Sequence, residues 1–469
     1  MASEAPVLLT DEQMRKFIVE GFLILKTDFP KEFHQRLMEQ LGFVYENEGN
    51  PGNNLLPRIR EVQKIFDHPI ITGALTSVLG PNYMMHAHRH GHYNAVATPG
   101  GWHKDSYWGY SRMRNHHPWW AMIMYFPQDT PVELGPTGVM PGTQNYESRV
   151  FDSDDGEALA NGEAGTFALI HYDIWHRSTA NILGNPRFML KFEFMRTVVP
   201  TEPSWNNEEA EWKQPVAMNP RIIPQEVMWR ETWNWLSGNV GSLENTILSD
   251  DSGVVESLAN ELRDPFEPSA LRGAYELACR GQRGINALLS ALQHEDAQVS
   301  RVAAYGLSVA GASAVEGLMH VLDDARSEVV THAVFALSEL GHYAKGATPK
   351  LCQLLDDAPE LVRRGIVESL SMIGAPMEQV VSGLILCLQD RDVHVRFMAG
   401  LSLTRLGSAG AAAVPYLERA LDDENRYVRA HAAEALKYIG TEDAKNVLVT
   451  ELFRSRWCFT TTPASTFYP

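Results

Sequence analysis

The second half of the chain repeats a pattern of apolar and polar positions about every 33 residues. Leucines and glycines mark the period, at Leu292, Leu322, Leu355, Leu388 and Leu421 and at Gly311, Gly341, Gly374, Gly407 and Gly440. Each unit reads as an apolar helix, an acidic turn and a second helix that ends at the glycine. One helix pair cannot bury its apolar face alone. The pattern therefore predicts an α-solenoid in which neighbouring pairs share a core.

The units of this half resemble short HEAT-like repeats, in which an aspartate is followed six residues later by an arginine. Three pairs carry the pattern: Asp357 with Arg363, Asp390 with Arg396, and Asp423 with Arg429. The resemblance implies a ladder of charge pairs between adjacent turns. Ser300 and Val330 stand at the arginine position of two other units, so we expect the ladder to be incomplete there. Residues 262–281 are expected to cap the stack.

The first half has a different pattern, which predicts a mixed structure rich in strands. Thr10 and Gln13 form a capping box for a helix that should continue to about Glu20, and GFLILK then reads as a strand. Gly/Pro-rich turns separate three further apolar runs, AMIMYFP, GTFALI and RFMLKFEFM. Short strands joined in this way favour an antiparallel sandwich or barrel. In the tryptophan-rich segment that follows, Pro224 and Gly238 are placed to begin and end a helix.

Length and composition agree with two architectures in one chain. The 469 residues are roughly three times the commonest domain size of about 150. Ten of the 11 tryptophans lie at or before Trp235, whereas the later sequence is rich in alanine and leucine. We divide the chain into a strand-rich domain at 1–200, a bridging segment at 201–255, a repeat domain at 256–454 and a tail at 455–469.

Charge and cysteine usage exclude several classes of protein. The formal net charge of −18 would repel a phosphate backbone, so we expect no nucleic-acid partner. The four cysteines form no CxxC pair, which argues against a disulfide scaffold and a thiolate zinc site. The amino-terminal segment lacks the pattern of a secretory signal, and no apolar run is long enough for a membrane span. These features predict a cytoplasmic protein that does not bind membranes.

Three His-x-Asp triplets are the candidates for chemistry: His103 with Asp105, His171 with Asp173, and His294 with Asp296. Such a pair and a distant histidine can hold ferrous iron on one face, with cis positions left for a chelating cosubstrate and oxygen. The triplet at 103–105 follows the tight turn TPGGW at the mouth of an expected strand. The triplet at 294–296 falls in an acidic turn of a helical repeat, where solvation explains it.

A distal histidine and an arginine complete the pattern. His176 precedes a turn, and Arg187 follows eleven residues later on the expected returning strand. A guanidinium binds a carboxylate through two parallel hydrogen bonds. Deep in a barrel below the metal, Arg187 would hold the distal carboxylate of 2-oxoglutarate while the keto-acid end chelates iron.

At this point residues 10–198 resemble the phytanoyl-CoA dioxygenase family of Fe(II)/2-oxoglutarate oxygenases. The matching segments are LTDEQMRKFIVEGFLIL, WHKD, LGPTGVMPGTQ, and WHRSTAN with Arg187. The resemblance implies a double-stranded β-helix, a jelly-roll or cupin-type barrel with flanking helices, followed here by the all-α HEAT-like solenoid. It implies that His103, Asp105 and His176 are the catalytic iron ligands, with Arg187 as the anchor of 2-oxoglutarate and Ser178 as its helper. Halogenating relatives have a small residue in place of this aspartate, so Asp105 favours hydroxylation with O2.

Other interpretations of these residues remain open. The set His171, Asp173 and His176 is a rival metal site, although convergence within six residues needs a sharp bend. The alternating histidines His86, His88, His90 and His92 would share one strand face, as a pocket wall or as core residues. The candidates for a substrate pocket are Tyr107, Trp108, Trp120 and His92, for which core packing is the alternative.

The sequence leaves more than one function open. The leading hypothesis is an Fe(II)- and 2-oxoglutarate-dependent dioxygenase that hydroxylates an unactivated C–H of a small molecule or a protein and releases succinate and CO2. The alternative is a HEAT-repeat scaffold for a protein partner, with a non-catalytic or regulatory barrel. An intact set of four site residues argues against a degenerate barrel.

Overall fold

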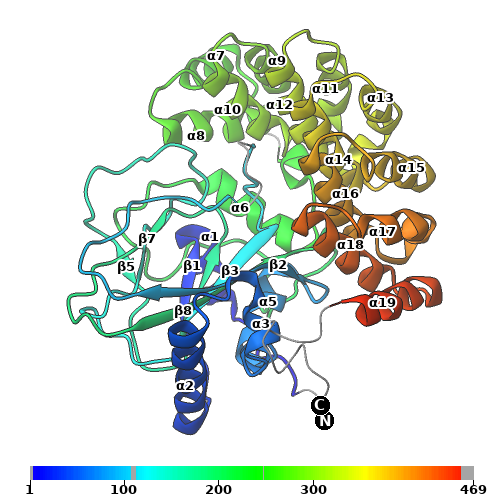
Figure 1. Cartoon of the computed structure of the whole chain (residues 1–469). Coiled ribbons are helices and arrows are strands. Elements are labelled where there is room, and N and C mark those ends of the chain that lie inside the picture. Colours follow the sequence, from blue (N-terminus) through cyan, green and yellow to red (C-terminus); the bar gives the residue numbers. More distant parts are fainter. Residues whose placement is uncertain (1–3, 107–111, 247, 456–469) are drawn as a thin grey trace. The chain divides into compact units, whose positions relative to one another are not determined.

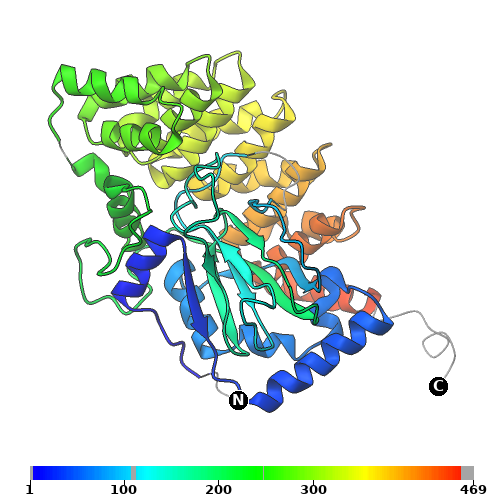
Figure 2. The same ribbon diagram turned by 90° about the vertical axis from the view of Figure 1, so that its left-hand side faces the viewer.

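The computed structural model describes residues 4–106, 112–246 and 248–455 (Figures 1 and 2). The chain divides into two compact units, Met1–Val240 and Gly241–Pro469. The first unit combines strands with helices, and the described part of the second is helical. This two-part layout confirms the prediction from the two sequence patterns. None of the described helices is long and apolar enough to span a lipid bilayer.

The first unit contains two antiparallel sheets. The larger has the order β1-β6-β3-β8-β2, and the smaller has the order β5-β4-β7. The strands of the larger sheet are β1 (Phe22–Lys26), β6 (Thr166–His171), β3 (Trp120–Tyr125), β8 (Arg187–Met195) and β2 (Met84–Asn94). Those of the smaller are β5 (Ala158–Leu159), β4 (Thr137–Val139) and β7 (His176–Ser178). The chain thus passes from the larger sheet to the smaller after β3, returns at β6, crosses again for β7 and returns at β8.

Helices cover one face of the larger sheet. The helices of the first unit are α1 (Asp11–Glu20), α2 (Lys31–Asn47), α3 (Leu55–Arg58), α4 (Val62–Phe66), α5 (Pro69–Leu79) and α6 (Glu226–Leu236), of which α6 packs on α1. The capping box of Thr10 and Gln13 starts α1, as the sequence predicts. Three phenylalanines on alternate positions of β8 face this layer: Phe188 meets Tyr45 of α2, Phe192 stacks on Phe66 of α4, and Phe194 also meets Phe66.

The other face of β8 carries Arg187, Met189, Lys191, Glu193 and Met195. All nine residues of β8 are buried, so this partly ionic face is turned to the protein interior and not to solvent. Directly opposite residues share a face of an antiparallel sheet, and Met124 of β3 lies opposite Lys191. On this face Met189 and Met195 alternate with charged side chains. Buried charges are unusual in a packed core, so the interior of the first unit is a candidate site.

The second unit stacks helix pairs in chain order, drawn from green to red in Figure 1. Its helices are α7 (Ser252–Glu261), α8 (Glu267–Ala278), α9 (Gly281–Leu292), α10 (Ala297–Leu307), α11 (Val315–Val321), α12 (Ser327–Glu339), α13 (Thr348–Leu354), α14 (Glu360–Ile373), α15 (Met377–Cys387), α16 (Val393–Leu406), α17 (Val414–Ala420), α18 (Arg426–Ile439) and α19 (Glu442–Arg454). The helices α12, α14, α16 and α18 pack on one another in succession. Gly374 and Gly440 end α14 and α18 in the left-handed conformation that glycine adopts without strain.

The expected charge ladder runs between consecutive repeats. Arg363 donates two hydrogen bonds of 2.8 Å to the carboxylate of Asp390, and Arg396 pairs in the same way with Asp423. Where Ser300 replaces the arginine, its hydroxyl donates to the carbonyl of Leu292 and lies 2.7 Å from Nδ1 of His332. The ladder is therefore ionic in the later repeats and uncharged at Ser300.

We predict that Arg363→Ala destabilises the repeat unit by about 3 kcal/mol, because it leaves a partly buried carboxylate without its partner. Urea unfolding followed by circular dichroism would show the loss as a lower midpoint of the helical transition. Tryptophan fluorescence should report the first unit, since ten of the 11 tryptophans lie at or before Trp235. The matched control is Arg391→Ala, an exposed arginine three residues after Leu388, which should change the midpoint little. Equal midpoints for the two variants would contradict the ladder's role.

Candidate metal centre

His103 and His176 are joined by a short antiparallel bridge between their backbones. The amide of each donates a 3.0 Å hydrogen bond to the carbonyl of the other. Upstream, the amide of Gly100 donates to the carbonyl of Ser178, so residues 100–103 run beside β7. A Cβ on Gly100 would lie 2.7 Å from Oγ of Ser178, which explains the glycine in the TPGG turn. Paired residues project their side chains to the same side, and the two imidazole centroids lie 4.5 Å apart.

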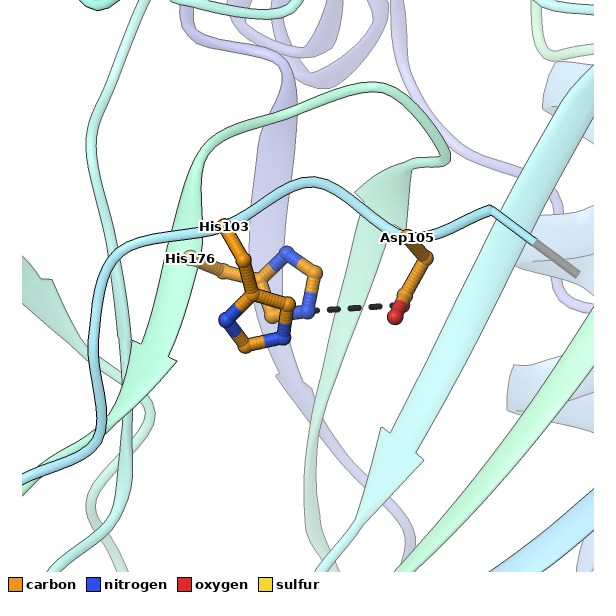
Figure 3. A group of neighbouring side chains, drawn as sticks. All are labelled: His103, Asp105 and His176. Carbon is orange, nitrogen blue, oxygen red and sulfur yellow. Dashed lines mark ion pairs between the residues drawn. The ribbon is translucent and has the colours of Figure 1, made fainter. Parts of the chain in front are cut away.

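Asp105 completes a group of three potential ligands (Figure 3). One ligand atom from each of His103, Asp105 and His176 lies within 4.8 Å of the others. Oδ2 of Asp105 is 3.4 Å from Nε2 of His176. This is the one such group of histidine, cysteine and acidic side chains in the described ranges 4–106, 112–246 and 248–455.

Both imidazoles are oriented by backbone carbonyls. Nδ1 of His103 lies 2.9 Å from the carbonyl oxygen of Gly101, and Nδ1 of His176 lies 3.1 Å from that of Ile174. A carbonyl can only accept, so each Nδ1 carries the proton and each Nε2 keeps a lone pair. Metal-binding histidines in proteins are held by the same kind of contact.

The electrostatics of the three residues suit a cation. Partial burial of the His103 ring lowers its pKa, and the nearby His176 lowers it further. The lower pKa favours the neutral imidazole that binds metals. Burial raises the pKa of Asp105, but the contacts of its carboxylate with His176 and Lys191 outweigh that effect. Together they hold the pKa of Asp105 well below its usual value. The site therefore offers two imidazole nitrogens and one carboxylate.

A cavity of about 260 Å³ connects the three residues with Arg187. Arg187 begins β8 and is 2% exposed. Two of its guanidinium nitrogens, Nε and Nη1, are buried without a hydrogen-bond partner. Burial lowers the pKa of Arg187 to about 10, so the group is still charged at neutral pH. A buried charge without a partner is costly, which indicates that the cavity is built to receive an anion beside this arginine.

Two hydroxyl groups line the same cavity beside β7. Ser178 of β7 lies directly opposite Thr137 of β4, and both contribute to the wall. His92 and Asn94 of β2 form part of another wall. Ser178 and His92 were predicted from the sequence. Thr137 was not, because nothing in the segment LGPTGVMPGTQ distinguishes it as a cavity residue.

Comparison with known proteins agrees with both halves of this description. Residues 31–189 match the family model of phytanoyl-CoA dioxygenase (PhyH), and residues 285–371, 348–437 and 381–455 match that of HEAT repeats. The chain carries a phytanoyl-CoA dioxygenase domain followed by HEAT repeats. No curated protein sequence matches the chain.

Several solved structures have a weak likeness to part of this chain. They include the alpha-ketoglutarate-dependent carbocyclase SnoK from nogalamycin biosynthesis, with 16% identity and a TM-score of 0.34 over 42% of this chain and 88% of that one. HygX from Streptomyces hygroscopicus with nickel and 2-oxoglutarate has 11% identity and a TM-score of 0.34 over 40% and 88%. The same protein with iron bound has 13% identity and a TM-score of 0.34 over 45% and 95%.

Among the residues that the structure describes, the other two His-x-Asp triplets do not belong to a group of three potential metal ligands. His171 ends β6 on the face toward α1, where its ring meets that of Phe17. Asp173 accepts a 2.6 Å hydrogen bond from Arg114. In the repeats, Asp296 caps the start of α10 by accepting from the amide of Gln298. Each of these carboxylates therefore has a structural partner.

The remaining residues predicted to line a substrate pocket do not all line the cavity. Tyr107 and Trp108 lie outside the described residues. Trp120 is buried on β3 against His86 and Tyr172 and is not among the residues that line the 260 Å³ cavity. The four alternating histidines do share one face of β2, as their spacing predicts, although a register shift lies between Met85 and Arg89. Of these four, His92 lines the cavity.

Two ionic residues of the domain were not predicted from the sequence. Lys191 is 6% exposed, lines the cavity and places its Nζ 2.7 Å from Oδ2 of Asp105. Glu193 is 1% exposed, approaches His86 and His88, and has its pKa raised to about 7 by burial. The signal was present in RFMLKFEFM, because Arg187, Lys191 and Glu193 are separated by even numbers of residues and so share a strand face.

We predict that His176→Ala lowers the affinity for a divalent ion by more than about 100-fold. Loss of a residue that only orients a metal ligand lowers metal affinity by about 10- to 100-fold, and loss of the ligand itself should lower it at least as much. Calorimetric titration with Co(II) measures the affinity, and circular dichroism checks the fold. His294→Ala, in the exposed triplet of the repeats, is the matched control and should bind like the wild type. Retained binding in His176→Ala, or equal loss in both variants, would contradict the assignment of this centre.

Proposed function

We propose that the phytanoyl-CoA dioxygenase domain is an Fe(II)- and 2-oxoglutarate-dependent dioxygenase that hydroxylates an unactivated C–H bond. In this proposal His103, Asp105 and His176 hold the iron, Arg187 and Ser178 hold 2-oxoglutarate, and O2 is the oxidant. The two antiparallel sheets are the two halves of a double-stranded β-helix. We place the catalytic domain at 1–200, the bridging segment at 201–255, the repeats at 256–454 and the tail at 455–469.

The observation that carries this proposal is the buried guanidinium of Arg187. It lines the same cavity as the three potential ligands, and its Nε and Nη1 have no partner within the described protein. A dicarboxylate that binds a metal through one end can present its other carboxylate to this group. Hydrogen bonds from the guanidinium to that carboxylate would then neutralise the buried charge.

The donor set at the other end of the cavity fits ferrous iron. Two histidines and one carboxylate on a single face are the usual protein ligands of non-heme Fe(II), and they leave coordination positions open. When bound, the iron supplies the activation of O2 that couples decarboxylation of the 2-oxo acid to oxidation of the substrate. The chain's own contribution is to fix the ligands, because the backbone bridge sets the spacing of the histidines and two carbonyls set their rotation.

The remaining residues of the cavity orient the cosubstrate. Ser178 and Thr137 offer hydroxyl donors beside Arg187, and Met124 and Met189 supply apolar walls. Asp105 remains ionised at neutral pH because its pKa is held well below the usual value, so it contributes a full negative charge. Arg187 and Lys191 are buried, and charge-assisted contacts are stronger where water is scarce.

The substrate is a small molecule or a protein, and the HEAT repeats supply a surface for a protein partner. A scaffold with an inactive barrel is the alternative. The two proposals differ in one measurable property, because a scaffold has no reason to consume 2-oxoglutarate.

We predict that the wild-type protein, given Fe(II), 2-oxoglutarate and O2 with a metabolite or peptide extract, forms succinate together with a product that has gained one oxygen. Mass spectrometry of both products makes the measurement, and omission of iron should abolish them. His176→Ala is the inactive comparison and His294→Ala the active control. Succinate formation that is the same in the wild type and in His176→Ala would refute the proposal, and its absence from every extract would favour the scaffold.

We predict opposite effects of Arg187→Met on binding and on stability. The apparent 2-oxoglutarate requirement should rise by roughly 10- to 100-fold, because a charge-assisted hydrogen bond contributes about 1.5–3 kcal/mol. Without 2-oxoglutarate, the melting temperature should rise, since an unpartnered buried charge is replaced by an apolar side chain of similar length. The exposed Arg149→Met is the control for both measurements. An unchanged 2-oxoglutarate requirement would count against the anchor role.

A further inference from the structure

Lys191 places a second cation at the candidate metal centre. Its side chain extends from β8 into the cavity, and its ammonium donates a 2.7 Å hydrogen bond to Oδ2 of Asp105. The lysine side chain is 7% exposed and the aspartate side chain 16%. Screening by water is therefore weak, and the pair interacts more strongly than a surface salt bridge.

The ammonium contacts the carboxylate oxygen that faces the histidines. The same Oδ2 lies 3.4 Å from Nε2 of His176, on the side where the three potential ligands converge. A divalent ion held by His176 and Asp105 must share this carboxylate with Lys191 or displace it. Two cations that compete for one carboxylate repel each other, so the lysine should weaken the binding of the ion.

The Lys191 ammonium also has N–H donors that are not used by other described residues. A lysine has three N–H donors, and within the described residues Lys191 uses one of them, on Asp105. The neighbouring imidazole of His92 is neutral, because burial lowers its pKa to about 3. Glu193, two residues further along the same face, is approached by His86 and His88. The unused donors of Lys191 therefore suit an anionic group that enters the cavity.

Arg187 and Lys191 mark two positive positions along one strand face. They are four residues apart on β8, which corresponds to about 13 Å of extended strand. Arg187 lies at the beginning of β8, and Lys191 lies beside Asp105. A 2-oxo dicarboxylate has two negative ends, of which one would meet each cation.

We propose that Lys191 is a cosubstrate-binding residue that neutralises Asp105 until a divalent ion takes the carboxylate, and then binds the carboxylate of the 2-oxo acid nearest the ion. The inference rests on the proposed function. It has a consequence that a purely structural role lacks: Lys191 weakens metal binding and strengthens cosubstrate binding, so its removal changes the two affinities in opposite directions.

The test compares Lys191→Met with Lys191→Arg, which keeps the positive charge. Titration calorimetry measures Co(II) binding to the full-length apoprotein and then 2-oxoglutarate binding to the Co(II)-loaded protein, with no turnover involved. For Lys191→Met we expect Co(II) affinity to increase about ten-fold or more and 2-oxoglutarate affinity to fall by a similar factor. Lys191→Arg should leave both affinities within a few-fold of the wild type. The control is Lys26→Met, which removes an exposed lysine that pairs with Glu163 at the end of β1 on the same sheet.

Each outcome decides between the proposals. If both affinities fall together in Lys191→Met, the lysine is structural and the inference is wrong; the same holds if neither changes. If the wild type binds neither Co(II) nor 2-oxoglutarate, the proposed function itself fails. Lys191→Gln, which keeps polar donors without the charge, provides the same comparison in a folded protein if the methionine variant aggregates.

Discussion

The reciprocal hydrogen bonds between the backbones of His103 and His176 are the constraint on which the centre depends. They tie a loop to the first residue of β7 and place two imidazoles on one side of the pairing. Because the bonds involve backbone atoms, the spacing of the two Cα positions does not depend on either side chain. The carbonyls of Gly101 and Ile174, each two residues before its histidine, then fix the rotation of the rings. The backbone framework of the candidate metal centre should therefore tolerate a substitution of one of these side chains.

The larger sheet supplies the charges that this backbone geometry lacks. On β8 the phenylalanines pack against helices, while Arg187, Lys191 and Glu193 point to the interior. Burying three ionic groups costs free energy, and only Lys191 has a close carboxylate partner, in Asp105. Nε and Nη1 of Arg187 have no hydrogen-bond partner among the described residues, and Glu193 lies near the imidazoles of His86 and His88. The apolar contacts on the opposite face of the same strand offset that cost, so one strand both stabilises the domain and carries the ionic groups of its cavity.

Local sequence patterns predicted what depends on neighbours along the chain. The capping box at Thr10, the helix between Pro224 and Gly238, and the repeats with their Asp–Arg pairs all follow from spacings of a few to about 33 residues. The choice of His103 and Asp105 over the other triplets rested on the TPGGW turn. Lys191 and Glu193 were missed because alternation cannot distinguish a polar face turned to solvent from one turned to a cavity. The contact of Lys191 with Asp105, which spans 86 residues, is a property of the assembled sheets.

The two units therefore differ in how substitutions should propagate. The repeats are held by contacts between adjacent turns, such as Arg363 with Asp390 across 27 residues, so a lost pair weakens mainly its two neighbours. The first unit joins segments far apart in the sequence, and their ordering entropy is recovered only when both sheets are formed. Its cavity residues lie on β2, β3, β4, β7 and β8, strands from both sheets, and on the loop that carries His103 and Asp105. A core substitution that loosens one strand should thus displace cavity residues contributed by the others, even where it touches none of them.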